Sequence, residues 1–587
     1  VNLWIVQKKA ASAAFLFCLL NVLCPSSGLN LLHLTGFPIG LFEVSLMLTY
    51  IPPESRRIIP TYEKPWLLML LAFVWFWPGV FSHDLWNPAE PVNFAAIEEL
   101  SQAKAWLPTV LGQSYFDVSP LYVWLSAGFR TLLSPNIADA YSASRFATVV
   151  FMALGLLCCG MAGYRFLGRY HGRSVVLILI GSPGLIVMGH FLGGMSVEFA
   201  ALGMMLYGWA LVKTRVIMAS LLLGGGWALL ASSAGLLLPL AFILVALALT
   251  LNKHWQRKRY YVTLVGSLSV ALPLACLYPF ALYQTDLAAF ALWKSHHMFG
   301  AFGGLETFNI DFSLLYYGRN ILWFAFPAWP LALWTIYKRK LAGSDWGVLC
   351  IAWLAAVSVL LILSPRQFQD YLVWLLPPLA LLGAANLDSL RRGAAAFLNW
   401  FGVMTFGLLA FFLWLGFFAM NYGWPAKLAE RSAYFSPYYV PDINIMPMAV
   451  ALLFTPIWLW SITRKHIRGR QAVTNWAAGM TLVWALLMTL FLPWLDAAKS
   501  YRPVVEQMDA VLPSNIACIA VAKEARTARL AWSQYSRVDL KVADDSCQYQ
   551  LQQQTLDTAA PKGWQTVWQG ARPRSRNEGF ELLQRQQ

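Results

Sequence analysis

Long apolar runs recur along almost the whole chain and are separated by short polar segments. A helix needs about 20 mostly apolar residues to cross the hydrocarbon core of a bilayer. One shorter segment, 119–133, carries Arg130 and is predicted to be a re-entrant or interfacial helix. The pattern predicts thirteen spanning helices, at 65–82, 144–163, 174–190, 195–212, 216–233, 235–252, 262–284, 319–337, 346–363, 370–386, 396–420, 446–463 and 474–496.

Basic residues gather in short clusters that fall in every second predicted loop, as in 338–340 and 464–470. The positive-inside rule places such loops in the cytoplasm. The first long loop, 83–143, and the tail, 497–587, then lie together on the opposite side. The same clustering argues against nucleic-acid binding as the reason for the net charge of +15. Only 12% of the residues are charged and 58% are hydrophobic, whereas soluble domains carry about 25% charge.

The two ends of the chain differ from the predicted membrane domain at 51–496. Residues 1–50 are predicted to be an N-terminal extension, either an extra helical hairpin or sequence upstream of a start at Met47. The tail is predicted to be a small α/β domain, with a helix at 504–512 and strands at 516–522 and 546–552.

Two of the eight cysteines, Cys518 and Cys547, lie in this polar tail. An oxidising compartment would favour a disulfide between them, and two unpaired buried thiols are the alternative. No Cys or Cys/His spacing typical of a metal site is present.

The first long loop carries a recognisable series of residues. It begins with Pro88-Ala89-Glu90-Pro91, and the others are Phe94, Ile97, Gly112, Tyr115, Phe116, Pro120, Leu121, Trp124 and Leu125. This series resembles the first periplasmic loop of GT-C membrane glycosyltransferases, in the branch of the lipid A aminoarabinose transferase, with the protein O-mannosyltransferases more distant. The resemblance implies an all-α polytopic GT-C fold with a small periplasmic α/β C-terminal domain.

The resemblance also implies an activity. Such enzymes move a sugar from a polyprenyl-phosphate-linked donor to a glycolipid, glycan or protein acceptor at the periplasmic face of the bacterial inner membrane. The chemistry requires a carboxylate for the acceptor, cations for the phosphate and an apolar groove for the lipid. Neither a nucleotide nor a nucleic acid is implied.

The chain departs from the family pattern at three positions. The family's Asp-Glu pair is Ala89-Glu90 here, Val118 stands where a lysine is usual, and Gly194 stands where a second acidic residue is usual. Glu90 or Asp84 is therefore predicted to be the catalytic base. The alternatives are a solvated loop carboxylate for Glu90 and a helix cap for Asp84.

Residues near the later spans complete the predicted site. Arg366 and Lys294 are scarce cations on the predicted periplasmic side, and an arginine can bind a phosphate through two hydrogen bonds. The alternative is a snorkelling arginine and an interfacial aromatic belt. A divalent cation is left open, with His190 as the residue that would contact it. The other predicted donor-binding residues are His296, His297, Tyr317, Gln369 and Tyr371.

The sequence therefore predicts a glycosyltransferase that uses a lipid-linked sugar. One alternative is a degenerate homologue that binds the carrier lipid without transfer. A transporter is the least favoured reading, because no internal repeat is visible and the charges stay in loops.

Overall fold

A computed structural model describes most of the chain after residue 65. The described ranges are 66–103, 106–339, 341–441, 445–463, 469–514, 516, 518–544, 546–554, 563–575 and 578–586. The predicted N-terminal extension, 1–50, lies outside them.

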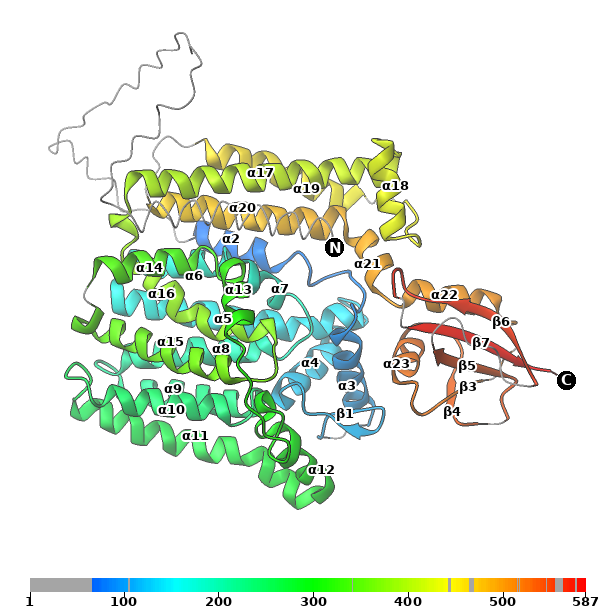
Figure 1. Ribbon diagram of the computed structural model, residues 1–587, viewed down its shortest axis with the longest axis horizontal. Helices are drawn as coiled ribbons and strands as arrows, with labels where there is room; N and C mark the ends of the chain where they lie inside the picture. The colour runs from blue at the N-terminus through cyan, green and yellow to red at the C-terminus, as the bar shows by residue number, and fades with distance from the viewer. Residues whose placement is uncertain are drawn as a thin grey trace, which may run out of the picture. The chain divides into compact units, whose positions relative to one another are not determined.

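Most of the described part is helical, and its apolar helices run alongside one another (Figure 1). Seven helices are long and apolar enough to cross a membrane. They are α5 (Ala140–Leu167), α9 (Val216–Ser233), α11 (Lys258–Thr285), α15 (Asp345–Leu363), α17 (Arg392–Tyr422), α19 (Ile445–Ile462) and α20 (Gly469–Leu490). The apolar helices α8 (Met195–Leu211) and α10 (Leu237–Leu249) are shorter. A polytopic membrane fold is confirmed, and the count of thirteen spans stays a prediction.

Four of the predicted spans are interrupted, and the last of them, 474–496, passes from α20 to α21 (Leu492–Lys499) at Phe491. The segment 174–190 divides into α6 (Arg169–Ile180) and α7 (Pro183–Met188). The segment 319–337 divides into α13 (Leu314–Phe324) and α14 (Ala328–Lys338). The segment 370–386 begins as a 3-10 turn, η4 (Gln369–Leu375), and continues as α16 (Leu376–Ala385). A proline stands at or near each interruption, where its missing N–H and its ring disfavour a continuous helix.

The remaining helices connect these spans or flank them. They are α2 (Trp66–Phe76), α12 (Leu287–Leu292), α18 (Ala426–Phe435) and α21 (Leu492–Lys499), with the short turns η1 (Trp293–His297), η2 (Gly300–Phe302), η3 (Leu341–Gly343) and η5 (Leu387–Ser389).

The first long loop is an ordered structure of its own. It holds α3 (Ala89–Ala103), the hairpin β1–β2 (Thr109–Val110 and Gln113–Ser114) and α4 (Pro120–Leu133). Phe94 and Ile97 lie on one face of α3 and are buried, in a core shared with Tyr122 of α4. The predicted short helix at 119–133 is therefore present as α4.

The tail forms a five-stranded sheet with two helices, α22 (Arg502–Val511) and α23 (Arg526–Tyr535) (Figure 1). The strand order is β4-β3-β5-β7-β6, and β3 is parallel to both of its neighbours. The strands are β3 (Ile519–Val521), β4 (Leu540–Val542), β5 (Tyr549–Gln554), β6 (Trp564–Gly570) and β7 (Gly579–Arg585). Cys518 and Cys547 form the predicted disulfide, with their Cα atoms 5.6 Å apart.

The first loop and the tail are in direct contact. The Gln534 side chain donates to Glu98, and the Leu85 N–H donates to the Tyr535 hydroxyl. Both segments must therefore lie on the same side of any membrane that the helices cross, as the charge pattern predicts. The structure does not identify that side as the periplasm, which stays a prediction.

Candidate functional site

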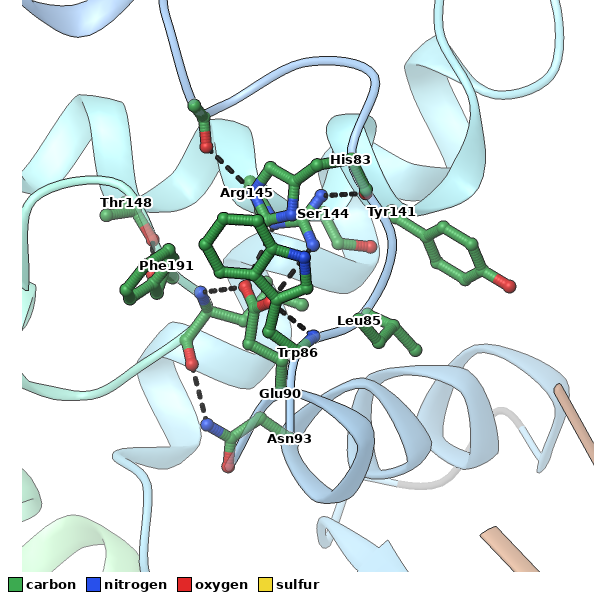
Figure 2. Close-up of polar contacts among 12 residues, drawn as sticks. His83, Leu85, Trp86, Glu90, Asn93, Tyr141, Ser144, Arg145, Thr148 and Phe191 are labelled. Atoms are coloured by element: carbon green, nitrogen blue, oxygen red, sulfur yellow. Dashed lines mark hydrogen bonds and ion pairs between the residues drawn. The ribbon is translucent and has the colours of Figure 1, made fainter. Parts of the chain in front are cut away.

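Glu90 lies in the first turn of α3 and forms a buried ion pair with Arg145 of α5. Arg145 Nε is 3.0 Å from Glu90 Oε1, and its Nη2 is 3.2 Å from Oε2 (Figure 2). The side chain of Arg145 is fully buried, and that of Glu90 is 3% exposed. Burial alone would raise the pKa of the Glu90 carboxyl, but the charges of Arg145 and His83 hold this pKa below its usual value.

Every oxygen of this carboxylate is also occupied by a backbone donor. The Trp86 N–H donates to Oε2 at 2.9 Å, and the Leu192 N–H donates to Oε1 at 2.9 Å. The remaining N–H groups of Arg145 donate to the carbonyl oxygens of His83 and Asp84. The ion pair thus joins the start of the first loop to α5 and to the turn that precedes α8.

Three neighbours hold the same turn in place. Asn93 of α3 donates to the Leu192 carbonyl at 2.7 Å, and Thr148 donates to the Phe191 carbonyl at 2.9 Å (Figure 2). The Gly193 N–H donates to the Tyr122 hydroxyl at 3.2 Å. We call Glu90, Arg145, Asn93, Thr148 and Tyr122 the polar clamp. Its geometry shows a structural task for Glu90, and the predicted role of Glu90 as a base stays a prediction.

Asp84, the other predicted base, is engaged by Arg502 at the start of α22. Arg502 Nε lies 2.9 Å from Asp84 Oδ2, and its Nη2 lies 2.7 Å from Oδ1. This pair joins the first loop to the C-terminal domain. Asp84 does not cap a helix here, because α3 begins only at Ala89.

Other predicted residues belong to a second region around His297, whose ring centroid lies 6.3 Å from that of Phe116 in the first loop. The charges of Asp117, from the first loop, and Arg366, which follows α15, both reach the His297 ring. The Tyr317 hydroxyl donates to the Arg366 carbonyl at 3.1 Å, and so fixes the backbone of that segment. We call Asp117, His297, Arg366 and Tyr317 the open mouth.

The exposure of Arg366 and Asp117 and the burial of His297 determine which groups of the open mouth are charged. Arg366 and Asp117 are exposed, and Arg366 forms no ion pair within the described residues. Burial lowers the pKa of His297 to about 4; the charge of Asp117 opposes this shift, and the charge of Arg366 adds to it. His297 is therefore neutral at pH 7 and can donate one hydrogen bond, while Arg366 supplies the positive charge.

The other predicted donor-binding residues divide into two sets. Gln369 and Tyr371 follow Arg366 in η4, and the Tyr371 ring stacks on Trp374 with centroids 4.5 Å apart. Lys294 and His296 are exposed on η1, whereas His297 on the same turn is half-buried. The two adjacent histidines thus differ in exposure, and His297 is the one on which the charges of Asp117 and Arg366 act.

His190 is fully buried, and both of its ring nitrogens face carbonyl oxygens. Nδ1 lies 2.5 Å from the Ile186 oxygen, and Nε2 lies 2.7 Å from the Trp75 oxygen. This arrangement leaves neither nitrogen for a metal. Within the described residues no group of three histidine, cysteine or acidic side chains could hold a metal ion.

Sequence reasoning missed two functional-site candidates. Arg145 is a charged residue inside an apolar run, which is a signal for a functional or paired group in a membrane helix. The second candidate is Glu198, in the first turn of α8. It is 2% exposed, and it accepts hydrogen bonds from Trp374 Nε1 at 2.5 Å and from Ser233 Oγ at 3.1 Å. It forms no ion pair in the described part of the chain.

The packing around position 194 does not require a glycine there. A Cβ there would meet only Ser233 Oγ at 3.5 Å and Val118 atoms at 3.7 Å, which are ordinary contacts. Its φ of −68° also suits any residue. Ala89 is exposed on the first turn of α3. Packing therefore does not exclude a Cβ at position 194, and a longer side chain at position 89 would extend from an exposed site.

The arrangement of apolar helices, an ordered first loop and a small C-terminal α/β domain defines a GT-C-type membrane fold. The chain is similar to the crystal structure of ArnT from Cupriavidus metallidurans in the apo state, with 16% identity and a TM-score of 0.58. That similarity covers 88% of this chain and 97% of ArnT. The crystal structure of the same protein bound to undecaprenyl phosphate gives 15% identity and a TM-score of 0.56, with the same coverage.

These likenesses confirm the predicted GT-C fold over most of the chain. No protein-family model matches the sequence, and no curated protein matches it either. At 15 and 16% identity the comparison establishes the fold, and the activity has to be argued from the site.

Proposed function

We propose that this chain is a glycosyltransferase that moves a sugar from a polyprenyl-phosphate-linked donor to an envelope acceptor. The acceptor would be a glycolipid, a glycan or a protein, reached at the periplasmic face of a bacterial inner membrane. The observation that supports the proposal is the open mouth, where the exposed Arg366 has no ion-pair partner within the described residues and its charge, with that of Asp117, acts on His297. It occurs in a fold shared with ArnT, which has been crystallised with undecaprenyl phosphate.

The proposed roles follow from the chemistry of transfer. An acceptor oxygen or nitrogen attacks C1 of the sugar, the bond from C1 to the phosphate oxygen breaks, and polyprenyl phosphate leaves. Arg366 would bind the phosphate through two hydrogen bonds, and neutral His297 would add one donor. Lys294, His296, Tyr317, Gln369 and Tyr371 are the proposed surroundings of this phosphate and its sugar.

A carboxylate must take the proton that the acceptor loses. Glu90 and Asp84 are the predicted bases, but Arg145 and Arg502 already engage them. Asp117 is an exposed carboxylate in the open mouth and becomes the third candidate. Inverting transfer would follow if the acceptor attacks from the face opposite the phosphate.

The same ion pairs favour a second candidate function, binding of the carrier lipid without transfer. If neither Glu90 nor Asp84 can accept a proton, the chain would retain the donor site and lack a catalytic base for the transfer. A transporter is not favoured by any observation in the described part of the chain.

One set of measurements separates the two functions. The purified full chain is tested for binding of polyprenyl phosphate and for transfer from a radiolabelled polyprenyl-phosphate sugar, beside Asp84→Asn, Glu90→Gln and Asp117→Asn. Transfer by the wild type that is lost in one variant, with thermal stability unchanged, identifies the base. Clear binding of polyprenyl phosphate with no transfer from any donor would contradict the proposal that the chain is an enzyme.

Two further variants test what the sequence departures mean. Ala89→Asp and Gly194→Asp each place a carboxylate where the family pattern has one; position 89 is exposed, and a Cβ at position 194 meets only ordinary contacts. Transfer that appears only in these variants would identify the wild type as the non-transferring form. The matched control is Gly193→Asp, one residue away on the same turn, where a Cβ also has open space.

A further inference from the structure

Two cations approach one tryptophan at the end of α14. Lys338 Nζ lies 5.2 Å from the centre of the Trp334 ring, and Arg391 Cζ, just before α17, lies 5.8 Å from it. Lys338 Nζ also lies 5.4 Å from the centre of the Tyr337 ring. We call Trp334, Tyr337, Lys338 and Arg391 the basic cluster. An aromatic face attracts a cation but does not neutralise it, so both positive charges remain.

No carboxylate of the described residues balances these charges. Lys338 and Arg391 are exposed, and neither forms an ion pair in the described part of the chain. The acidic residues of the neighbouring connections, Asp345 and Asp388, pair instead with basic residues outside the cluster. Arg392, the first residue of α17, adds a further exposed cation. The basic cluster is therefore a positively charged surface that is open to an anion.

The indole N–H of Trp334 lacks an acceptor among the described residues. Its Nε1 is buried and forms no hydrogen bond there. A buried donor that stays unsatisfied is unfavourable, and such a group calls for a partner. An anion held by Lys338 and Arg391 would bring oxygen atoms to the ring that carries this donor.

The basic cluster lies at the end of the membrane domain that is opposite to the tail. Arg391 directly precedes α17, a candidate span of 31 residues that ends at Tyr422. Past that far end, Ser436 after α18 donates to the Trp494 carbonyl of α21 at 3.1 Å, and α21 leads into the tail. A helix of this length extends over about 46 Å, more than the hydrocarbon core of a bilayer. The cluster and the tail must therefore lie on opposite sides of any membrane that α17 crosses.

Apolar surface adjoins the basic cluster. On α14, Leu333 and Ile336 are 53% and 43% exposed, and on α17, Phe397 is 52% exposed. In a membrane, apolar side chains exposed on the outside of the helices face the acyl chains of lipids. Tryptophan, tyrosine, lysine and arginine are typical of the level at which acyl chains give way to headgroups. The basic cluster therefore stands at the headgroup level of one leaflet.

We propose that the basic cluster binds the phosphate of an anionic phospholipid in the leaflet opposite the tail. Lys338 and Arg391 contact the phosphate, and the acyl chains lie against Leu333, Ile336 and Phe397. A net negative headgroup is favoured over a zwitterionic one, because the cluster offers cations and no free carboxylate of the described residues. The open mouth includes Asp117 of the first loop, so this lipid site lies across the membrane from it.

The test is binding of tritiated phosphatidylglycerol to the full chain in an uncharged detergent. Phosphatidylcholine with the same acyl chains and inorganic phosphate are the competitors. The key variants are Lys338→Gln, Arg391→Gln and the two combined, because glutamine keeps a polar side chain and removes the charge.

The matched control combines Lys253→Gln and Arg257→Gln, which removes two exposed cations outside the basic cluster. Both residues precede α11, a candidate span whose other end leads to α12 beside the first loop. They therefore lie on the same side of the membrane as the cluster. Thermal unfolding of each variant without added lipid checks that it is folded.

We expect each single variant to bind phosphatidylglycerol about fivefold more weakly, and the double variant about 25-fold, from the usual contribution of one cation near an anionic headgroup. The control should bind like the wild type, and phosphatidylcholine should compete poorly. An equal loss in the control would indicate a general effect of surface charge and overturn the proposal, as would unchanged binding in both single variants or equal displacement by phosphatidylcholine. Displacement by inorganic phosphate would identify a soluble anion as the ligand and overturn the lipid assignment. Transfer activity plays no part in this readout.

Discussion

The polar clamp and the open mouth use similar side chains for opposite purposes. In the clamp, Glu90 and Arg145 are buried, and each carboxylate oxygen and each guanidinium nitrogen has a hydrogen-bond partner. In the mouth, Arg366 and Asp117 are exposed, and Arg366 has no ion-pair partner in the described part of the chain. A satisfied buried pair holds segments together, while an unpaired cation at a surface is available to a ligand. Charge in a membrane protein thus indicates function only after its partners are known.

The largest expected effect separates the two regions by stability. Arg145→Ala leaves the Glu90 carboxylate buried without its partner and should cost about 3–5 kcal/mol of folding free energy. Thermal unfolding of the detergent-purified protein measures this loss. Arg366→Ala is the matched variant, and it should unfold like the wild type. Equal stability of Arg145→Ala and the wild type would mean that the clamp is not structural.

The next effect concerns ligand binding at the mouth. Arg366→Ala removes a charged hydrogen-bond donor, which is worth about 1.5–3 kcal/mol, or about 10- to 150-fold in affinity for polyprenyl phosphate. Equilibrium binding to the purified chain measures it. Arg319→Ala, at an exposed arginine on α13 outside the mouth, is the control and should bind normally. Unaltered affinity in Arg366→Ala would remove Arg366 from the donor site.

The pH dependence of the mouth gives a third comparison. The pKa of His297 is lowered to about 4, so its charged form is disfavoured in the folded state. Stability should be unaffected by this group above the unfolded pKa of about 6.5 and should fall as the pH drops from there through 4. His297→Gln should weaken this acid sensitivity, as measured by unfolding at pH 4.5 and pH 7.5. A steeper loss in the variant would contradict the assignment.

The smallest effect tests whether burial is what distinguishes the clamp. Arg130 of α4 and Glu98 of α3 form a pair at 3.0 Å, the same distance as in the clamp, but both side chains are more than 20% exposed. Arg130→Ala should therefore change the free energy of unfolding by no more than about 1 kcal/mol. A loss as large as that of Arg145→Ala would show that position in the first loop, rather than burial, sets the cost.

The sequence by itself determined the membrane class, the positions of the apolar helices and the shared side of the first loop and tail. It could do so because helix length in a bilayer and the distribution of lysine and arginine are local properties of the chain. The resemblance in the first loop, with Phe94 and Ile97 on one helical face, indicated the GT-C fold that the comparison confirms. The sequence left a Cys518–Cys547 disulfide and two unpaired thiols as alternatives, and the structure has the disulfide.

Only the tertiary structure decided what the charged residues do. Glu90 and Asp84 appeared free in the sequence, because their partners Arg145 and Arg502 are 55 and 418 residues away. The sequence leaves His190 open as a metal contact, and only the structure shows that its two ring nitrogens face the Ile186 and Trp75 carbonyl oxygens. Pairing and burial arise from long-range packing, which no local pattern records. For the same reason the open mouth at Arg366 is visible only in the folded chain, where distant segments come together.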